Sequence, residues 1–277
     1  MNSTTVRRTS LDVDGRAASY LTAGDGPMVL LLHGTYWSRV WLPVVEPLAA
    51  AGLRPVAVDL PGCGRSEGEL TLDTATIPEL AAWLARFRAA LGGAEPVAVA
   101  GHDIGGAVAQ HVLVTGGFEV GRLALVNSVT YDSWPVPGVS RFRDPEVVAA
   151  TTARDILAAR RQALTAALAR PAAEDELADY LAPWADPRVA RSWMALAGAA
   201  DSRYTGELVD ALRDSQTPKL LVWGEDDAFQ PVGYAERFAA EMPRSRLVRV
   251  ADAGHIPMEN DPAAVADALS AFFKEDR

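Results

Sequence analysis

Pro96-Val97-Ala98-Val99-Ala100-Gly101-His102-Asp103-Ile104-Gly105-Gly106 is the most informative segment of this 277-residue sequence. The residues before Gly101 form a short apolar run, which is typical of a strand buried on both faces. A Gly-x-Asp-x-Gly turn then leads directly into an alanine-rich segment with helical spacing. Glycines are needed there because such a turn is strained and the helix packs too closely on the strand for Cβ atoms. The segment predicts that Asp103 projects from the turn at a helix N-terminus, where a negative charge is favoured by about 0.3–1 kcal/mol.

Asp103 also has a purely structural interpretation, because aspartate is a common N-cap residue. Two later segments favour a chemical role instead. One predicted strand is followed by Gly224 and the acidic cluster Glu225-Asp226-Asp227, and the last predicted strand is followed by a loop that carries His255. A carboxylate, an acidic cluster and a histidine thus each follow a predicted strand.

Short apolar runs recur along the chain and end in glycine or acidic turns. They are Met28–Leu32, Pro55–Val58, Pro96–Ala100, Leu123–Val126, Lys219–Trp223 and Arg246–Val250. Alanine-rich segments with helical spacing separate most of them, for example Ile77–Leu91, Ala107–Val114 and Tyr234–Met242. An opening pair, Thr9–Val13 and Ala17–Thr22, is joined by Asp14-Gly15, which is a hairpin signal. This alternation predicts an α/β fold in which helices flank a mostly parallel eight-stranded sheet that begins with an antiparallel edge.

The alternation of strands and helices breaks between residues 132 and 215. After a proline-rich turn, this stretch has helical spacing at Asp144–Thr152, Ala153–Ala169, Ala173–Leu181, Pro187–Ala197 and Gly206–Leu212. Helices inserted between two sheet strands are typical of a lid. We therefore expect a core formed by residues 1–131 and 216–277, and a helical cap formed by residues 132–215. The aromatic residues of the cap fit either a small core of its own or an apolar pocket over the sheet.

Composition argues against several functional classes. A formal net charge of −10 and a pI near 4.9 disfavour a nucleic-acid or anionic membrane partner. The single cysteine, Cys63, permits no internal disulfide, and residues 1–10 lack the apolar region of a secretory signal. The longest apolar runs are too short to cross a bilayer. We expect a soluble, cytoplasmic protein, and a homodimer is among the oligomeric states that the sequence allows.

Two further motifs complete a familiar order. His33-Gly34 follows the first parallel strand, and Asp59-Leu-Pro-Gly62-Cys-Gly64-Arg-Ser66 follows the next one as a glycine-rich turn. With the Asp103 turn, the acidic cluster and His255, these motifs resemble the α/β-hydrolase superfamily over nearly the whole chain. The Gly-His-Asp-Ile-Gly-Gly segment resembles the nucleophile elbow of that fold, with aspartate where serine is more usual, as in epoxide hydrolases and their dehalogenase relatives.

This resemblance implies a set of site residues. The catalytic set is the nucleophile Asp103, the base His255 and the acid Asp227, which orients the base. Asp226 and Glu225 compete for the role of the acid, but Asp227 lies three residues after Gly224, where the family carries it. The oxyanion amides are those of Thr35 and Ile104.

The remaining candidate ligands favour structural roles. We expect His33 and His102 to hold loops together by hydrogen bonds, and His111 to be structural. No cluster of His, Cys, Asp or Glu has metal-ligand spacing, so we expect no metal. Gly62-Cys63-Gly64 is too short for a dinucleotide fingerprint, and we expect no cofactor.

An aspartate nucleophile points to a particular chemistry. A carboxylate is already charged and attacks without a base. Attack on an ester carbonyl would give an anhydride, whereas attack on a saturated carbon with a leaving group gives an alkyl ester. His255 would then activate water to hydrolyse that ester, with Asp227 fixing its tautomer. The residue type therefore favours opening an epoxide or displacing a halide.

The leaving group decides which helper residues are needed. Related dehalogenases carry a halide-binding tryptophan or an arginine after the nucleophile, but here that position is Ile104. An epoxide needs a proton donor, which in the family is a lid tyrosine. Tyr204 is the first candidate acid, with Tyr131, Tyr180 and Tyr36 as alternatives. The family's His-Gly-x-Pro reads His33-Gly34-Thr35-Tyr36 here, which makes Tyr36 and Trp37 plausible pocket walls, and Trp134 is a further pocket candidate.

Three functional hypotheses follow. The first is an epoxide hydrolase acting on a small apolar organic substrate under the lid. The second is a haloalkane dehalogenase or another hydrolase of the same fold. The third is a non-hydrolytic catalyst or ligand binder in which Asp103 serves as an acid–base group, since a fold does not fix a function.

Overall fold

A single eight-stranded sheet runs through the computed structural model, which describes residues 4–275. The strands are β1 (Arg7–Val13), β2 (Arg16–Thr22), β3 (Met28–Leu32), β4 (Arg54–Val58), β5 (Val97–Asp103), β6 (Val120–Ser128), β7 (Lys219–Gly224) and β8 (Ser245–Val250). Their order in the sheet is β1-β2-β4-β3-β5-β6-β7-β8. β1 pairs antiparallel with β2, and β2 antiparallel with β4, whereas all later pairs are parallel. The predicted mostly parallel sheet with an antiparallel edge is confirmed.

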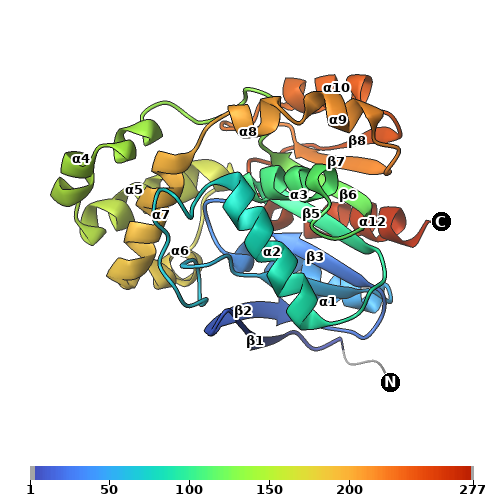
Figure 1. Ribbon diagram of the computed structural model, residues 1–277, viewed down its shortest axis with the longest axis horizontal. Coiled ribbons are helices and arrows are strands. Elements are labelled where there is room, and N and C mark those ends of the chain that lie inside the picture. The colour runs from blue at the N-terminus through green and yellow to red at the C-terminus, as the bar shows by residue number, and fades with distance from the viewer. Residues whose placement is uncertain (1–3, 276–277) are drawn as a thin grey trace.

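Helices cover both faces of this sheet (Figure 1). Those outside the insertion are α1 (Leu42–Ala50), α2 (Ile77–Leu91), α3 (Ile104–Thr115), α10 (Val232–Glu241), α11 (Pro257–Asn260) and α12 (Pro262–Lys274). Successive residues of β3 alternate between two apolar cores. Val29 and Leu31 pack with α1 and α12, whereas Leu30 and Leu32 pack with α2 and α3. Because side chains alternate along a strand, a continuous apolar run is needed to fill both cores.

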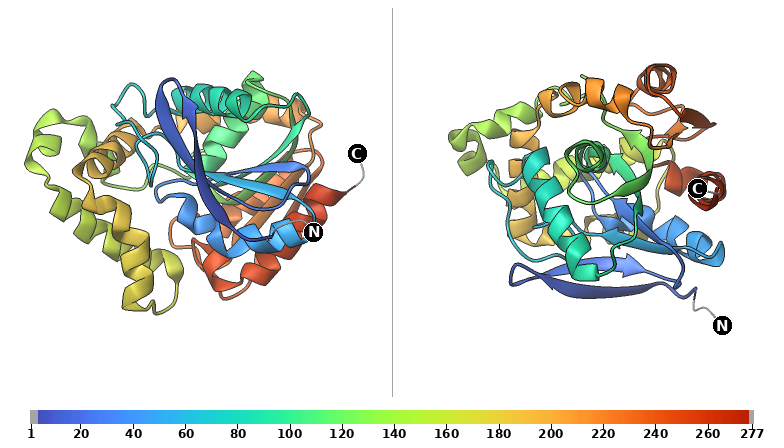
Figure 2. Two further views of the ribbon diagram at one scale, coloured as in Figure 1. Left: turned by 90° about the horizontal axis from the view of Figure 1, so that it is seen from below. Right: turned by 45° about the vertical axis from the view of Figure 1, so that its right-hand side comes forward.

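The insertion between β6 and β7 is helical. It contains the short 3-10 segments Val139–Arg143 and Ala182–Ala185 and the helices α4 (Pro145–Ala150), α5 (Ala153–Leu168), α6 (Glu174–Leu181), α7 (Pro187–Ala199), α8 (Arg203–Gly206) and α9 (Val209–Asp214). Helices α4 to α7 lie together to one side of the sheet in all three ribbon views (Figures 1 and 2). The predicted helix over Gly206–Leu212 is wrong, because α8 ends at Gly206 and α9 begins only at Val209. Glycine favours such an interruption because it is a poor helix former.

Hydrogen bonds from several loops tie this insertion to the rest of the chain, and three of them show where it is held. The indole N–H of Trp37 donates to the carbonyl of Tyr180 at 2.9 Å. The amide of Leu70 donates to the Ser192 hydroxyl at 3.0 Å, and the amide of Ile256 donates to the carbonyl of Ala167 at 3.3 Å. These contacts come from the loops after β3, β4 and β8, so the insertion is held over the carboxyl ends of the parallel strands. Within residues 4–275, no helix is long and apolar enough to span a membrane.

Candidate active site

Asp103 occupies the strained turn that the glycine pattern predicts. β5 ends at this residue and α3 begins at the next one, with Asp103 at φ 54° and ψ −127°. A positive φ is unusual for a residue with a Cβ atom and is often found at functional sites. A Cβ on Gly105 would lie 2.5 Å from the carbonyl oxygens of Leu32 and His33, so only glycine fits. Asp103 makes no side-chain cap bond to α3, which rules out the simple N-cap interpretation.

The Asp103 carboxylate is held from the side of β3. One of its oxygens, Oδ2, accepts hydrogen bonds from the amide of Thr35 at 2.9 Å and from the Thr35 hydroxyl at 3.0 Å. A Cβ on Gly34 would collide with this carboxylate, so the glycine lets the chain approach it. Ile104 is the first residue of α3, and its amide therefore has no partner within that helix. The two predicted oxyanion residues thus flank Asp103.

His255 lies between two carboxylates. Its Nδ1 is 2.9 Å from Oδ2 of Asp227, which is a hydrogen bond, and its Nε2 is 3.9 Å from Oδ2 of Asp103. The second distance is too long for a hydrogen bond but short enough for a strong interaction between charges. All three side chains are buried. Asp103, which lies more than a hundred positions before Asp227 and His255 in the sequence, therefore meets both of them at one edge of the sheet.

Asp227 is the acid that reaches His255, and it is firmly positioned. Its Oδ1 accepts hydrogen bonds from the amides of Phe229 at 2.7 Å and Gln230 at 2.9 Å. The two competing acids, Asp226 and Glu225, are exposed, and Glu225 pairs with Arg249 instead. The loop after β7 thus wraps its own amides around the Asp227 carboxylate.

Asn127, near the carboxyl end of β6, is a site residue that the sequence analysis does not identify. Its side-chain amide donates to Oδ2 of Asp227 at 2.7 Å, and its Oδ1 accepts from the amide of Gly224 at 2.9 Å. It is buried and has a positive φ of 40°. The signal that could have found it is a polar residue ending a predicted parallel strand, because ligand sites of α/β sheets lie at that edge.

The charges of these groups stabilise one another. Burial opposes the charged form of His255, but the charges of Asp227 and Asp103 outweigh it and raise the pKa of this imidazole to about 10. Burial also opposes ionisation of Asp103, yet His255 and then the amide of Thr35 hold the pKa of this carboxyl below its usual range. The pKa of Asp227 is likewise lowered against its burial by His255 and Asn127. The arrangement is therefore an imidazolium between two carboxylates at neutral pH.

The other two buried histidines hold loops, as the sequence predicts. The Nδ1 of His33 lies 2.9 Å from the carbonyl of Gly34, and its Nε2 accepts from the amide of Leu60 at 2.9 Å. The Nε2 of His102 lies 2.7 Å from the carbonyl of His255 and so braces the loop that carries this residue. Burial lowers the pKa of His102 to about 4, so this ring is neutral.

A cavity of about 240 Å³ lies against Asp103 and His255. It is lined by Thr35, Tyr36, Asp103, Val136, Val139, Ala159, Arg160, Ala163, Trp193, Phe229, Gln230 and His255. Six of these residues belong to the insertion, which therefore closes the cavity opposite the strand ends: Val136, Val139, Ala159, Arg160, Ala163 and Trp193. This volume is smaller than the roughly 300–1,000 Å³ of typical ligand pockets, which fits a small molecule.

Of the predicted acid and pocket candidates, Tyr36 lines this cavity. Tyr204, the first candidate acid, packs half-buried in the core on the α3 side of the sheet. The hydroxyl of Tyr131 donates to Glu241 at 3.2 Å, and that of Tyr180 donates to Glu259 at 2.8 Å. The indole of Trp134 donates to Thr205 at 2.7 Å, as that of Trp37 does to the carbonyl of Tyr180. These side chains are used to join segments of the fold and do not line the cavity.

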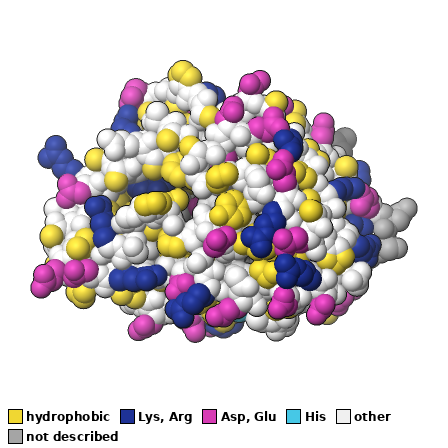
Figure 3. Space-filling view, turned by 90° about the horizontal axis from the view of Figure 1, so that it is seen from above, with side chains coloured by type: hydrophobic (Ala, Val, Ile, Leu, Met, Phe, Trp, Pro, Cys, Tyr) yellow, Lys and Arg dark blue, Asp and Glu magenta, His cyan; other side chains and the backbone are white. Residues whose placement is uncertain are grey.

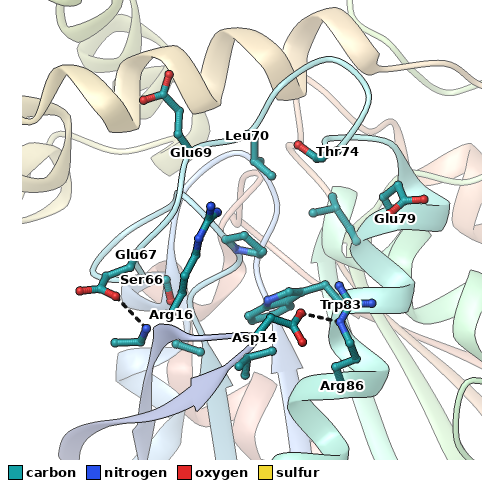
Figure 4. A pocket seen from close by; sticks show the side chains of 15 residues that line it. Asp14, Arg16, Ser66, Glu67, Glu69, Leu70, Thr74, Glu79, Trp83 and Arg86 are labelled. Atoms are coloured by element: carbon teal, nitrogen blue, oxygen red, sulfur yellow. Dashed lines mark hydrogen bonds and ion pairs between the residues drawn. The ribbon is translucent and has the colours of Figure 1, made fainter.

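Other hollows lie away from these residues. The one in Figure 4, of about 300 Å³, lies between the β1–β2 hairpin and α2, and its charged wall includes the ion pair of Asp14 with Arg86 at 2.7 Å. On the face drawn in Figure 3, hydrophobic side chains gather near the middle, and acidic and basic side chains are mixed around them. Among residues 4–275, no group of three His, Cys, Asp or Glu side chains is placed to hold a metal ion.

Comparison with known proteins gives the family. A model described as the alpha/beta hydrolase family matches residues 29–268, and the chain belongs to that family. It is 31% identical over 250 residues to the dihydrolipoyllysine-residue acetyltransferase component of the acetoin cleaving system of Cupriavidus necator, covering 88% of this chain and 63% of that protein. It is 27% identical over 287 residues to a soluble epoxide hydrolase of Corynebacterium sp. (strain C12), covering 94% of this chain and 95% of that protein.

Solved structures support the same branch of the family. A putative ancestral haloalkane dehalogenase superposes with a TM-score of 0.82 at 26% identity, covering 96% of this chain and 98% of that one. The epoxide hydrolase CorEH superposes with a TM-score of 0.81 at 24% identity, covering 97% of this chain and 99% of that one, which shows the shared fold. The protein is thus an α/β hydrolase related to epoxide hydrolases and haloalkane dehalogenases.

Proposed function

We propose that this protein hydrolyses an epoxide to a diol, with Asp103 as the nucleophile, His255 as the base and Asp227 as the acid that orients it. The observation that carries the proposal is the position of Asp103. It is an ionised, uncapped carboxylate on a strained turn, it lines a small cavity, and its Oδ2 lies 3.9 Å from the imidazole Nε2. In this proposal, residues 132–215 act as a cap that shields the reaction from bulk water.

The first step is attack on carbon. Thr35 holds Oδ2 of Asp103 by two hydrogen bonds, which leaves Oδ1 free to attack a ring carbon of the epoxide. The carbon–oxygen bond of the ring breaks, its electron pair goes to the oxygen, and this oxygen takes a proton. Tyr36 is the proposed proton donor because it lines the same cavity. Burial raises the pKa of Tyr36 to about 12, so its hydroxyl is protonated and ready to donate at neutral pH.

Formation of the ester changes His255. Esterified Asp103 carries no charge, so one of the two carboxylates that raise the pKa of the imidazole is lost, and this pKa falls. The proton that His255 then releases replaces the one taken from Tyr36. Neutral His255 can now act as a base, a role it could not fill while protonated. His255 therefore becomes able to act as a base only after the ester has formed.

The second step returns the enzyme to its starting state. Water adds to the ester carbonyl as His255 takes its proton, and the amides of Thr35 and Ile104 stabilise the oxyanion, a contribution of about 3 kcal/mol per donor. The bond from the carbonyl carbon to the alkyl oxygen breaks. The diol leaves with the carboxyl proton, and Asp103 is again a carboxylate beside a protonated His255.

A trapping experiment tests this route. We expect wild type to convert members of a panel of epoxides to diols, and His255→Gln to stop at the ester, since attack needs no base but hydrolysis does. Intact-mass spectrometry of His255→Gln with a converted epoxide should show one substrate adduct, on the peptide that contains Asp103. Asp103→Asn is the matched control and should form no adduct and lose at least about 10⁴-fold in turnover.

Three results would count against the proposal. They are diol formation with no adduct on His255→Gln, full activity of Asp103→Asn, and release of halide from haloalkanes by a wild type that opens no epoxide. A single turnover in heavy-oxygen water gives an independent check, because the label should enter the Asp103 side chain.

A further inference from the structure

Arg160 is a buried cation in the proposed active-site cavity, and no described carboxylate pairs with it. It belongs to α5, it is 5% exposed, and its side chain lines the cavity together with Asp103 and Tyr36. Its Nε and Nη2 are enclosed and have no hydrogen-bond partner. Within residues 4–275, no carboxylate forms an ion pair with it. A buried guanidinium stays charged and is costly to leave unpaired, so such an arrangement calls for an explanation.

Aromatic rings surround this guanidinium but do not neutralise it. Its central carbon lies 4.4 Å from the ring centre of Tyr36, 5.2 Å from that of Trp193 and 5.5 Å from that of Trp184. Ring faces attract a cation, and the Tyr36 hydroxyl interacts with this guanidinium, yet none of these groups carries a net charge. Burial raises the pKa of Tyr36 to about 12 in spite of the opposing charge of Arg160, so this phenol is neutral as well. The cage positions the cation and leaves its charge unbalanced.

Two arginines close to Arg160 in the sequence each pair with a glutamate. Arg161 is exposed and makes two hydrogen bonds to Glu174, at 3.1 and 3.0 Å. Arg170, just after the end of α5, pairs with Glu176 at 2.6 Å. The insertion therefore provides carboxylates for these two arginines and none for the arginine in the cavity.

We propose that Arg160 binds an anionic group of the substrate, a carboxylate, so that the preferred substrate is a small epoxy acid. This inference rests on the proposed epoxide chemistry at Asp103 and goes beyond it by naming the substrate class. It departs from the apolar substrate that the sequence predicts. A guanidinium is well suited to a carboxylate because the two groups are planar and complementary in charge.

The charges in the cavity also orient such a substrate. Asp103 is an anion and repels the carboxylate, whereas Arg160 attracts it from the side of the insertion. The acid group would therefore point to Arg160 and the epoxide would remain near Asp103. The net charge of −10 gives no general attraction for anions, so the recognition has to come from this local cation.

Two substrates that differ only in charge can measure how strongly Arg160 favours a carboxylate. The pair is 5,6-epoxyhexanoate and 5,6-epoxyhexanamide, which have the same shape and differ in charge. We expect wild type to prefer the acid in kcat/KM by about 10- to 150-fold, the range for a hydrogen bond between charged groups. Arg160→Met should bring the ratio of the two kcat/KM values close to one, and Arg160→Lys should keep part of the preference. Arg161→Met is the matched control on the same helix and should leave the ratio unchanged.

Three outcomes overturn the proposal. The first is a wild type with no preference for the acid, which decides the matter even where Arg160→Met fails to fold. The second is an Arg160→Met variant that keeps the preference. The third is an equal loss on both substrates, because Arg160 would then assist the opening of the ring and would not bind the acid group.

A binding measurement separates this inference from the proposed reaction. Asp103→Asn, which should not turn over, is titrated with hexanoate and with hexanamide by calorimetry. Hexanoate should bind at least about 10-fold more tightly, and Arg160→Met in the same background should abolish the difference. Tight hexanoate binding without turnover of any epoxide by wild type would refute the reaction and retain the anion site. Equal binding of both ligands beside normal epoxide turnover would refute the anion site and retain the reaction.

Discussion

The charged groups on the two sides of the cavity differ in how they are paired. On the sheet side, which comprises Thr35, Asp103, Asn127, Asp227 and His255, every charged group faces a partner of opposite charge or a hydrogen-bond donor. On the insertion side, no described carboxylate pairs with the guanidinium of Arg160, and the indole N–H groups of Trp184 and Trp193 beside it have no acceptor. The charged side chains Asp103, Asp227, His255 and Arg160 are all buried.

This difference indicates that the two sides of the cavity have different functions. Polar groups that the protein satisfies by itself are held in place before any substrate arrives, which is what a catalytic group requires. Polar groups that the protein leaves unsatisfied are stabilised when a ligand supplies the missing partner. The sheet side is thus organised for reaction and the insertion side for recognition. Each prediction below tests one part of this comparison.

The largest expected effect is the pH dependence of stability that His255 contributes. Its pKa is about 10 in the folded protein and close to 6.5 when unfolded, so folding favours the protonated ring. This stabilisation is fully present below pH 6.5 and is lost as the pH rises through 10. We expect the free energy of unfolding to fall by roughly 2–4 kcal/mol across that window.

Chemical denaturation between pH 6 and 10.5 measures this loss. Other groups also titrate at high pH, so the quantity that matters is the difference between wild type and His255→Gln. Asp103→Asn removes one of the two carboxylates and should shift the loss to lower pH. If the free energy of unfolding depended on pH in the same way for wild type and His255→Gln, the sheet side would not hold an imidazolium. The contrast between the two sides of the cavity would then be wrong.

The second prediction concerns Asn127. Replacement by leucine removes the donor to Asp227 and leaves the amide of Gly224 without its acceptor. Asp227 then orients His255 less well, and His255 acts only when the ester is hydrolysed. We expect the rate of ester breakdown to fall by about 10- to 150-fold, as for loss of a hydrogen bond to a charged group. The alkyl-enzyme should therefore accumulate during turnover, which quench-flow mass spectrometry detects.

A matched control is available in Asn260. This asparagine also braces the loops of the site, with its Oδ1 accepting from the amide of Gly254 at 3.1 Å and its amide donating to Leu168 at 2.7 Å, but it does not contact Asp227. If Asn260→Leu slowed ester breakdown as much as Asn127→Leu, Asn127 would be a general brace and not a positioning residue for the acid.

The sheet side was largely predictable from the sequence, for physical reasons. The turn at Asp103 needs glycines at fixed spacing, because Cβ atoms would collide with backbone that belongs to the fold itself. Such steric constraints act on residues close together in the chain, so they leave a recognisable glycine pattern in the sequence. Asn127 left only a weak signal, since a single asparagine after an apolar run also occurs at the start of ordinary loops.

The insertion side was not predictable in the same way. Tyr204 was the expected acid because it lies near the end of the helical stretch, yet the chain places it in the core beside α3 and brings Tyr36 to the cavity. Arg160 and Arg161 are adjacent in the sequence, and one is buried while the other is exposed. Which of two neighbouring arginines faces inward depends on how α5 packs against α6, α7 and α11, and that packing involves residues far along the chain.

The smallest expected effect concerns the surface charges where the insertion meets the core. Arg191 of α7 and Glu69 form a bidentate ion pair at 2.7 Å, and the two side chains are 52% and 40% exposed. Exposed pairs contribute little because water and salt screen them, so a double-mutant cycle with Arg191→Met and Glu69→Gln should give a coupling energy below about 1 kcal/mol that decreases with added salt. Substrate preference should not change, because neither residue lines the cavity. A coupling above about 2 kcal/mol, or a change in preference, would mean that rim charges and not the buried cation set how the insertion recognises its ligand.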